Sequence, residues 1–144
     1  QWDVIHFNFG LHDLKRVDGA TGQNSNDPSD PRQAEPDRYR ANLTDIAGRL
    51  KATGATVIFA TTTPVPEGEL RPHRDPADAP RYNAIAREVM AKHGVLVNDL
   101  FEVIASGPAS LGKPANVHFT REGSAALGAA VAAFVLEAAE SERR

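Results

Sequence analysis

Two short stretches, far apart in the chain, carry the side chains best suited to chemistry. The first is residues 10–13 (Gly-Leu-His-Asp), and the second is residues 116–120 (Asn-Val-His-Phe-Thr). Histidine titrates near neutral pH, so the imidazole of His118 is suited to take and return a proton during acyl transfer. The apolar neighbours Val117 and Phe119 can shield it from water. The competing interpretation is a histidine that only hydrogen-bonds its own loop.

The stretch at residues 10–13 follows an apolar run that ends at a glycine. In an open α/β sheet, ligands bind outside the carboxyl ends of the strands, which is where His12 and Asp13 would then lie. From that place the His12 imidazole can donate a hydrogen bond to an oxyanion, while Asp13 orders the turn. The alternative is a turn in which Asp13 only bonds its own backbone. His6 lies inside the apolar run and is interpreted as a core histidine.

A metal site is a competing use of the same side chains. His12, Asp13 and His118 make a two-histidine, one-carboxylate set of the kind that holds zinc or non-haem iron. None of the pairs shows a helix-spaced ligand motif such as His-Glu-x-x-His, so we predict no metal site. The sequence also lacks a phosphate loop and a dinucleotide-binding glycine fingerprint, and we expect no cofactor.

Strands and helices that alternate along the chain must position these residues. The patterns predict strands at residues 3–9, 55–60 and 95–97, and helices that begin at Pro36, at Pro80, after an Asp99 cap and after a Thr120 cap. Such alternation indicates βαβ units with a parallel sheet between helices. The sequence therefore predicts an α/β fold of which three strands are visible.

Composition limits the class of protein. A length of 144 residues suits one domain, and nothing in the net charge of -3 without a basic run suggests a nucleic-acid surface, so we expect no nucleic-acid partner. The absence of cysteine excludes disulfides and a cysteine nucleophile. We see no apolar stretch of the roughly 18 residues that a membrane helix needs, and expect no membrane partner. Because the chain starts at Gln1, directly before a buried strand, we expect residues upstream to be missing. Compartment and oligomeric state are left open.

Several short motifs, in this order and spacing, resemble the SGNH (GDSL-type) hydrolase family of esterases and lipases. They are residues 8–13 (Asn-Phe-Gly-Leu-His-Asp), residues 62–66 (Thr-Thr-Pro-Val-Pro), Tyr82-Asn83, and residues 117–120 (Val-His-Phe-Thr) followed by Glu122-Gly123. The resemblance implies a flavodoxin-like, three-layer α/β/α fold. It covers essentially the whole chain, so residues 1–144 are expected to form a single, N-terminally truncated domain that corresponds to the C-terminal two-thirds of the family's domain.

The resemblance also implies roles for individual residues. The family's Gly-x-Asn-Asp block supplies an oxyanion donor, and here His12 stands in the place of the asparagine. His118 matches the family's general base, but Ala115 stands where the acid that orients this base is usual. Asn116 or a main-chain carbonyl is then expected to hold the imidazole, as the asparagine of Cys-His-Asn sites does. The residues expected to line the substrate site are Gly10, Asp13 and Asn116.

The nucleophile is not recognisable in this chain. In the family, the serine lies in a Gly-Asp-Ser block after the first strand, and a second block adds a glycine N–H to the oxyanion hole. Neither block is present, and the serines of the chain fall in predicted loops, helices or the tail: Ser25, Ser29, Ser106, Ser110, Ser124 and Ser141. We therefore expect a carboxylesterase or acetylesterase acting on small or acylated-carbohydrate esters, with its serine encoded upstream and this piece inactive alone. The alternative is a carbohydrate-binding or interaction module that kept the fold and lost the chemistry, as Ala115 and His12 would favour.

Overall fold

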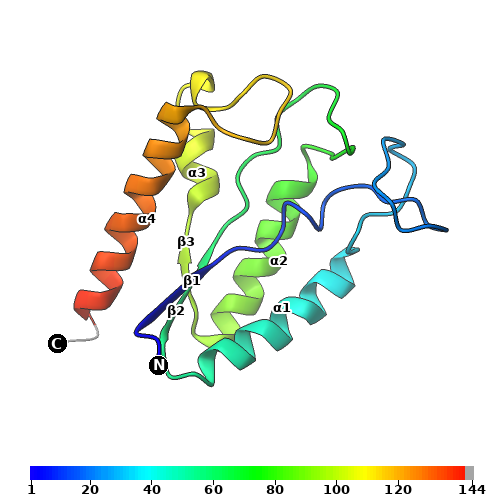
Figure 1. The fold of residues 1–144 in the computed structure, drawn as a ribbon. Coiled ribbons are helices and arrows are strands. Elements are labelled where there is room, and N and C mark those ends of the chain that lie inside the picture. Colours follow the sequence, from blue (N-terminus) through cyan, green and yellow to red (C-terminus); the bar gives the residue numbers. More distant parts are fainter. Residues whose placement is uncertain (142–144) are drawn as a thin grey trace.

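Three parallel strands form the centre of this computed structural model, which describes residues 1–141. Strands β1 (Val4–Phe7), β2 (Thr56–Ala60) and β3 (Leu96–Asn98) lie side by side in chain order. Val4 pairs with Thr56, and Ile58 pairs with Leu96. All three strands run in the same direction, so their carboxyl ends meet at one edge of the sheet (Figure 1).

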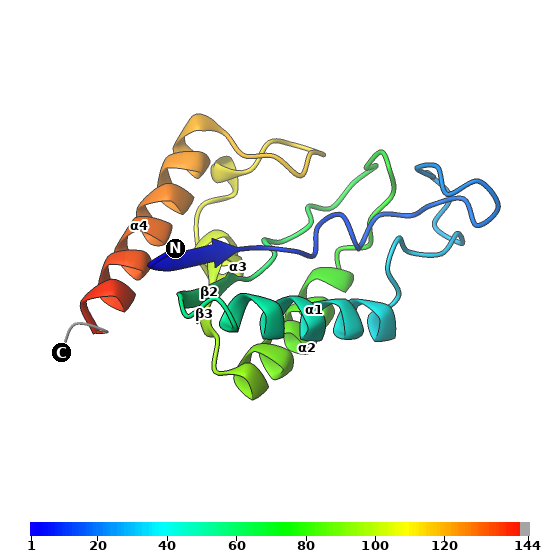
Figure 2. The same cartoon turned by 60° about the horizontal axis from the view of Figure 1, so that its bottom comes forward.

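Helices cover both faces of this sheet. Helices α1 (Pro36–Lys51) and α2 (Asp78–His93) pack together on one face, and α4 (Arg121–Ser141) lies on the other with α3 (Leu100–Ala105) beside it (Figures 1 and 2). A short 3-10 turn, η1 (Ala109–Leu111), precedes α4. The predicted α/β fold with three visible parallel strands is thus confirmed.

Local sequence signals set the ends of most helices. Pro36 is the first residue of α1, as predicted, and Gly94 ends α2 in the left-handed conformation at φ 61°. Asp99 caps α3 by accepting from the Glu102 N–H at 3.4 Å. The Thr120 hydroxyl accepts from the Gly123 N–H at 3.1 Å and so caps α4. These predicted start and stop signals are confirmed.

Two predicted boundaries were wrong by two residues, and the other strand boundaries by at most one. Helix α2 begins at Asp78 and not at Pro80, because Pro80 is tolerated in the first turn, where backbone N–H groups have no helical partner. Strand β1 ends at Phe7 and not at residue 9. The carbonyl of Phe9 accepts instead from the Tyr39 hydroxyl at 2.7 Å, which draws the chain away from the sheet.

The core lies mainly between the sheet and the α1/α2 layer. Its largest buried side chains include Leu14, Tyr39, Leu43, Phe59, Tyr82 and Met90. The predicted inner face of α4 is less completely covered: Ala138 is buried, whereas Leu127, Val131, Phe134 and Val135 are half-buried. Strand β1 is half-buried along its length. The two helix layers therefore differ in how completely they bury their apolar residues.

The expectation that no segment has the length and apolar character of a membrane span was wrong for α4. Within the described residues, this one helix contains an 18-residue window of mean hydropathy 1.4 with at most 2 charged side chains, and 11% of the window is buried. The window is rich in alanine and glycine, small residues that add little apolar surface each. The finding concerns length and composition only.

Candidate active site

Three loops meet above the carboxyl edge of the sheet (Figure 1). One follows β1 and carries residues 8–13, one joins β2 to α2 over residues 61–77, and one precedes α4 over residues 112–120. Leu11 and Val117 pack onto the core from the first and the last of these loops. The fold thus brings both chemistry-bearing stretches to the same end of the sheet, which is where this architecture binds ligands.

The His118 imidazole is in contact with the Asn116 side chain. Its Nδ1 lies 2.8 Å from Asn116 Oδ1, and the backbone N–H of His118 donates to the same oxygen at 2.9 Å. A backbone N–H can only donate, so the amide atom facing it must be the oxygen. Nδ1 must then also donate, which leaves the lone pair on Nε2 of the neutral ring. This is the tautomer that a general base needs on an exposed ring.

Short-range contacts build the loop that carries this pair. The Lys113 N–H donates to the His118 carbonyl at 3.0 Å, and the Thr120 N–H donates to the Leu111 carbonyl at 2.9 Å. A Cβ on Gly123 would lie 2.1 Å from that carbonyl oxygen, so the first turn of α4 requires glycine there. Ala115 has φ 46°, in the left-handed region that non-glycine residues adopt rarely. Gly123 of the Glu122-Gly123 motif therefore has a packing reason.

Long-range contacts build the loop that carries His12. A Cβ on Gly10 would lie 2.0 Å from Thr62 Oγ1, so only glycine allows the chain to pass this close to the end of β2. The Tyr39 hydroxyl holds the Phe9 carbonyl, and Arg74 Nε donates to the Leu11 carbonyl at 2.9 Å. His12 itself is exposed on the outside of the turn. The backbone of this loop is fixed, and its imidazole is free to meet a ligand.

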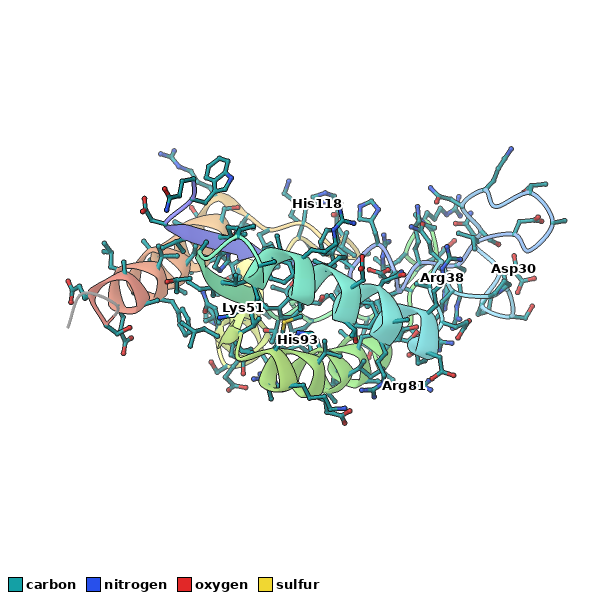
Figure 3. All side chains as sticks on the ribbon, turned by 90° about the horizontal axis from the view of Figure 1, so that it is seen from below. Asp30, Arg38, Lys51, Arg81, His93 and His118 are labelled. Carbon is teal, nitrogen blue, oxygen red and sulfur yellow. The ribbon has the colours of Figure 1, made fainter. Side chains whose placement is uncertain are left out.

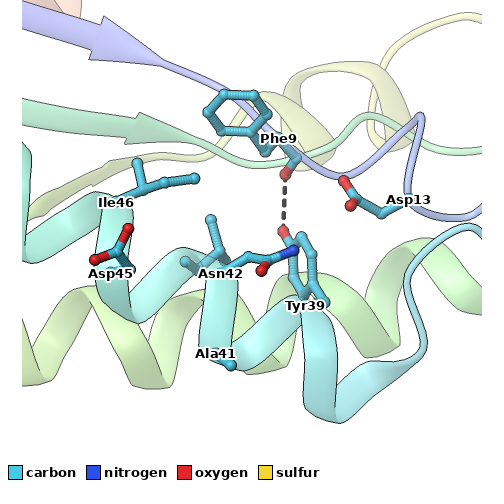
Figure 4. A pocket seen from close by; sticks show the side chains of 8 residues that line it. Phe9, Asp13, Tyr39, Ala41, Asn42, Asp45 and Ile46 are labelled. Atoms are coloured by element: carbon cyan, nitrogen blue, oxygen red, sulfur yellow. Dashed lines mark hydrogen bonds between the residues drawn. The ribbon is translucent and has the colours of Figure 1, made fainter.

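Asp13 is half-buried beside two cavities. One, of about 360 Å³, is also lined by Gly10, His12 and Gln33. The other, of about 520 Å³, runs along α1 past Tyr39, and Figure 4 shows Asp13 beside the bonded Phe9 and Tyr39. Burial raises the pKa of Asp13, although a backbone N–H and the charges of His12 and Arg38 act in the opposite direction. Neither His12 nor His118 lines the larger cavity.

The predicted site residues therefore form two groups. Gly10, His12 and Asp13 share one cavity, whereas Asn116 and His118 line two smaller ones of about 210 and 140 Å³. None of these four cavities is lined by both histidines. Nor do three or more metal-binding side chains cluster anywhere in residues 1–141. Arg74 links the groups, since it bonds the carbonyl beside His12 and lines the 140 Å³ cavity with His118.

Sequence reasoning missed the residues that hold the loops in place. Asn83 accepts from the Thr62 N–H and donates to the Thr62 carbonyl, both at 2.8 Å, which fixes the chain just after β2. The Tyr82 hydroxyl donates to the Ala34 carbonyl at 2.7 Å. The Tyr82-Asn83 pair was visible as a motif, but its role was not. Arg74 had no signal, because an arginine in a polar loop is unremarkable by sequence.

The surroundings of the remaining histidines indicate structural roles. His6 is half-buried with its Nε2 3.3 Å from Asn98 Nδ2, and burial lowers the pKa of His6. The backbone of His73 ties the loop before α2 to the loop at residues 14–35. His93 ends α2 and lies apart from His118, on the other side of α1 in Figure 3. Within the described residues, His118 has no hydrogen bond to a serine hydroxyl.

Comparison with known proteins places this arrangement in context. The profile of the GDSL-like Lipase/Acylhydrolase family matches residues 1–126. A lipase/acylhydrolase from Enterococcus faecalis superposes with a TM-score of 0.67 at 23% identity, over 90% of this chain and 58% of its own. LAE5, an alpha/beta hydrolase enzyme from the metagenome of Lake Arreo, Spain, gives 0.65 at 20% identity, over 96% of this chain and 60% of its own. No curated protein sequence matches. At these identities the two structures establish the fold, and the chain spans about three-fifths of their length.

Proposed function

We propose that this chain, which belongs to the GDSL-like lipase/acylhydrolase family, supplies the general base and part of the oxyanion hole of an ester hydrolase. The observation that carries the proposal is the contact between Asn116 Oδ1 and His118 Nδ1 at 2.8 Å. It leaves Nε2 of an exposed imidazole as a proton acceptor at the carboxyl edge of a parallel sheet. Family membership supports ester hydrolysis in general, and the residues of this chain support the finer assignment.

The proposed reaction proceeds through an acyl-enzyme. A serine hydroxyl from a segment outside these residues attacks the ester carbonyl while His118 Nε2 takes its proton. The oxyanion of the tetrahedral intermediate accepts a hydrogen bond from the His12 imidazole. Collapse of the intermediate releases the alcohol, which takes the proton from His118. Water, activated by the same imidazole, then hydrolyses the acyl-enzyme.

Asn116 takes the place of the acid that usually orients such a base. In a serine-protease triad, an asparagine at the position of the acid lowers turnover about 10⁴-fold, because it favours the wrong imidazole tautomer. Here the backbone N–H of His118 holds the amide oxygen, and not its NH₂ group, against Nδ1. The Asn116 side chain therefore supports the productive tautomer, although it adds no charge. An acid at position 115, where this chain has alanine, is therefore not needed to orient His118.

The substrate site is proposed to lie between the two loops. Gly10, Asp13 and Asn116 would line it, and the loops at residues 14–35 and 64–78 would shape it, because specificity on this architecture resides in loops. We propose small esters, including acylated carbohydrates, as the substrate class. We propose no nucleic-acid or membrane partner.

Replacing His118 by alanine, in a version of the protein that includes the upstream segment, tests this function. We expect kcat/KM for p-nitrophenyl acetate to fall about 10²- to 10⁴-fold, the usual contribution of a positioned general base. His93→Ala is the matched control, since His93 lies at the end of α2, and should leave the rate unchanged. Full activity of His118→Ala would exclude this assignment.

A binding module without chemistry is the second candidate. It is favoured by one observation, that the described residues place no serine hydroxyl in hydrogen-bond contact with His118. Such a module would bind carbohydrates or a protein partner without hydrolysing esters. The encoding gene separates the two: a Gly-Asp-Ser block after an apolar strand upstream supports the enzyme, and a start codon directly before Gln1 supports the module.

A further inference from the structure

Arg74 is a buried arginine without a counter-charge. It is 7% exposed and lies in the loop between β2 and α2. Its Nε donates to the Leu11 carbonyl at 2.9 Å and its Nη1 to the Pro72 carbonyl at 3.3 Å, and both acceptors are neutral. Among the residues that the structure describes, no carboxylate pairs with it.

The buried Arg16 and the partly buried Arg32 differ from Arg74 in this respect. Arg16 is equally buried and lies 4.0 Å from the carboxylate of Asp78. Arg32 binds the same carboxylate through two bonds, at 2.6 and 2.8 Å. The fold thus supplies an acid to neutralise the buried Arg16 and the partly buried Arg32, and leaves Arg74 unneutralised.

A buried charge without a counter-charge is unfavourable unless a ligand of opposite charge neutralises it. Removing a charge from water is costly when no opposite charge replaces the water. Burial lowers the pKa of Arg74, yet a guanidinium keeps its proton at any physiological pH. No hydrogen bond to a described residue uses Nη2, so this nitrogen can donate to a bound group.

Arg74 faces a small polar cavity that His118 also lines. The cavity measures about 140 Å³, and its other lining residues are Leu70, Arg71, Ala115, Asn116 and Val117. Arg71 adds a second guanidinium, which is paired at 2.6 Å with the exposed Glu69. At about 30 Å³ per water molecule, the space would hold four or five waters. It suits one compact charged group better than a sugar ring.

We propose that Arg74 binds an anionic group of the substrate, a carboxylate or a phosphate, in this cavity beside His118. The inference rests on the proposed ester hydrolysis and narrows its substrate class to esters that carry a negative charge close to the scissile bond. Guanidinium recognises both anions through paired N–H donors, with shorter and stronger hydrogen bonds than neutral partners form. An anion there would also neutralise the buried charge.

Two esters that differ in charge test the proposal in the protein that includes the upstream segment. We expect Arg74→Gln to lower kcat/KM for 4-nitrophenyl hemisuccinate about tenfold or more, the usual contribution of a hydrogen bond to a charged group. The rate for neutral 4-nitrophenyl butyrate should fall by a clearly smaller factor, because loss of the bond to the Leu11 carbonyl affects both esters alike, so the ratio of the two rates reports the anion. Arg49→Gln, on the exposed face of α1, is the control and should affect neither ester. An equal loss with both esters would show a purely structural Arg74 and overturn the proposal.

A measurement of anion binding that needs no turnover tests the Arg74 site independently of the proposed ester hydrolysis. Succinate and inorganic phosphate are titrated separately against the unmodified protein and against Arg74→Lys, while the NMR signals of His118 and Asn116 are followed. Saturable shifts that weaken in Arg74→Lys support the site, and the tighter of the two probes identifies the anion. Such shifts in a protein that hydrolyses no ester would reject the hydrolase and retain the anion site. Absence of shifts with both probes would overturn the anion site.

Discussion

The two histidine-bearing loops present similar side chains on very different supports. The loop at residues 8–13 is held by bonds from Tyr39 of α1 and from Arg74 of the loop before α2, and its Gly10 passes close to Thr62 just after β2. The loop at residues 112–120 is held by its own neighbours, through bonds among residues 110–123. Both expose an imidazole at the same edge of the sheet.

This difference predicts that substitutions in one loop affect catalysis, whereas substitutions in the other affect stability. Changes in the loop at residues 112–120 should alter what His118 does while the fold persists, because few other elements depend on it. Changes in the loop at residues 8–13 should alter the fold first, because its contacts reach into the buried core.

Asn116→Ala should have the largest effect, and it should be on turnover. Without Asn116 Oδ1 the imidazole loses the acceptor that fixes its tautomer and orientation, and we expect kcat to fall about 10²-fold, the size of effect that a misplaced catalytic group produces. The midpoint of urea unfolding should stay close to that of the unmodified protein. Asn116→Asp keeps an oxygen acceptor and should restore the rate. Equal losses in both variants would mean that Asn116 does not position His118.

Gly10→Ala should act in the opposite way, on stability first. Its Cβ would lie 2.0 Å from the hydroxyl of Thr62, a side chain that is 2% exposed and has no room to move. Overpacking of this kind costs roughly 1–3 kcal/mol of unfolding free energy, measurable by urea denaturation. Gly128→Ala is the control, because nothing lies near its Cβ in the exposed part of α4, and it should stabilise by up to about 1 kcal/mol. A neutral Gly10→Ala would mean that this loop is not tightly built.

Tyr39→Phe should have a smaller effect on the same loop. The variant removes the hydroxyl that donates to the Phe9 carbonyl at 2.7 Å, and a lost hydrogen bond of this kind costs about 1 kcal/mol. Tyr82→Phe removes the comparable bond to Ala34 and should cost about as much in unfolding free energy. Only Tyr39→Phe should also lower kcat/KM, because Phe9 leads into His12. If the two variants lost turnover equally, the loop at residues 8–13 would not be a separate unit of the site.

The same contrast explains how much of the molecule the sequence predicts. Pro36, Gly94, Asp99 and Thr120 act on backbone groups within a few residues, so their effects on helix ends are visible in the sequence. Asn116 and His118 are two positions apart, and their contact follows from a local turn. Local chemistry was therefore predictable.

Long-range partners were not predictable from one sequence. Arg74 reaches a carbonyl 63 positions away, and Arg32 reaches Asp78 across 46 positions. Nothing in the type or spacing of these residues identifies such partners before the chain is folded. The length of the apolar window in α4 was also underestimated, because its many alanines make the helix apolar without a long run of large apolar side chains.

The tautomer of His118 tests the central claim most directly. Long-range ¹H–¹⁵N NMR of the neutral imidazole distinguishes a proton on Nδ1 from one on Nε2. The contact with Asn116 predicts a protonated Nδ1 and an unprotonated Nε2, and Asn116→Ala should shift the population toward Nε2–H. A proton found mainly on Nε2 in the unmodified protein would contradict the assignment of His118 as a general base oriented by Asn116.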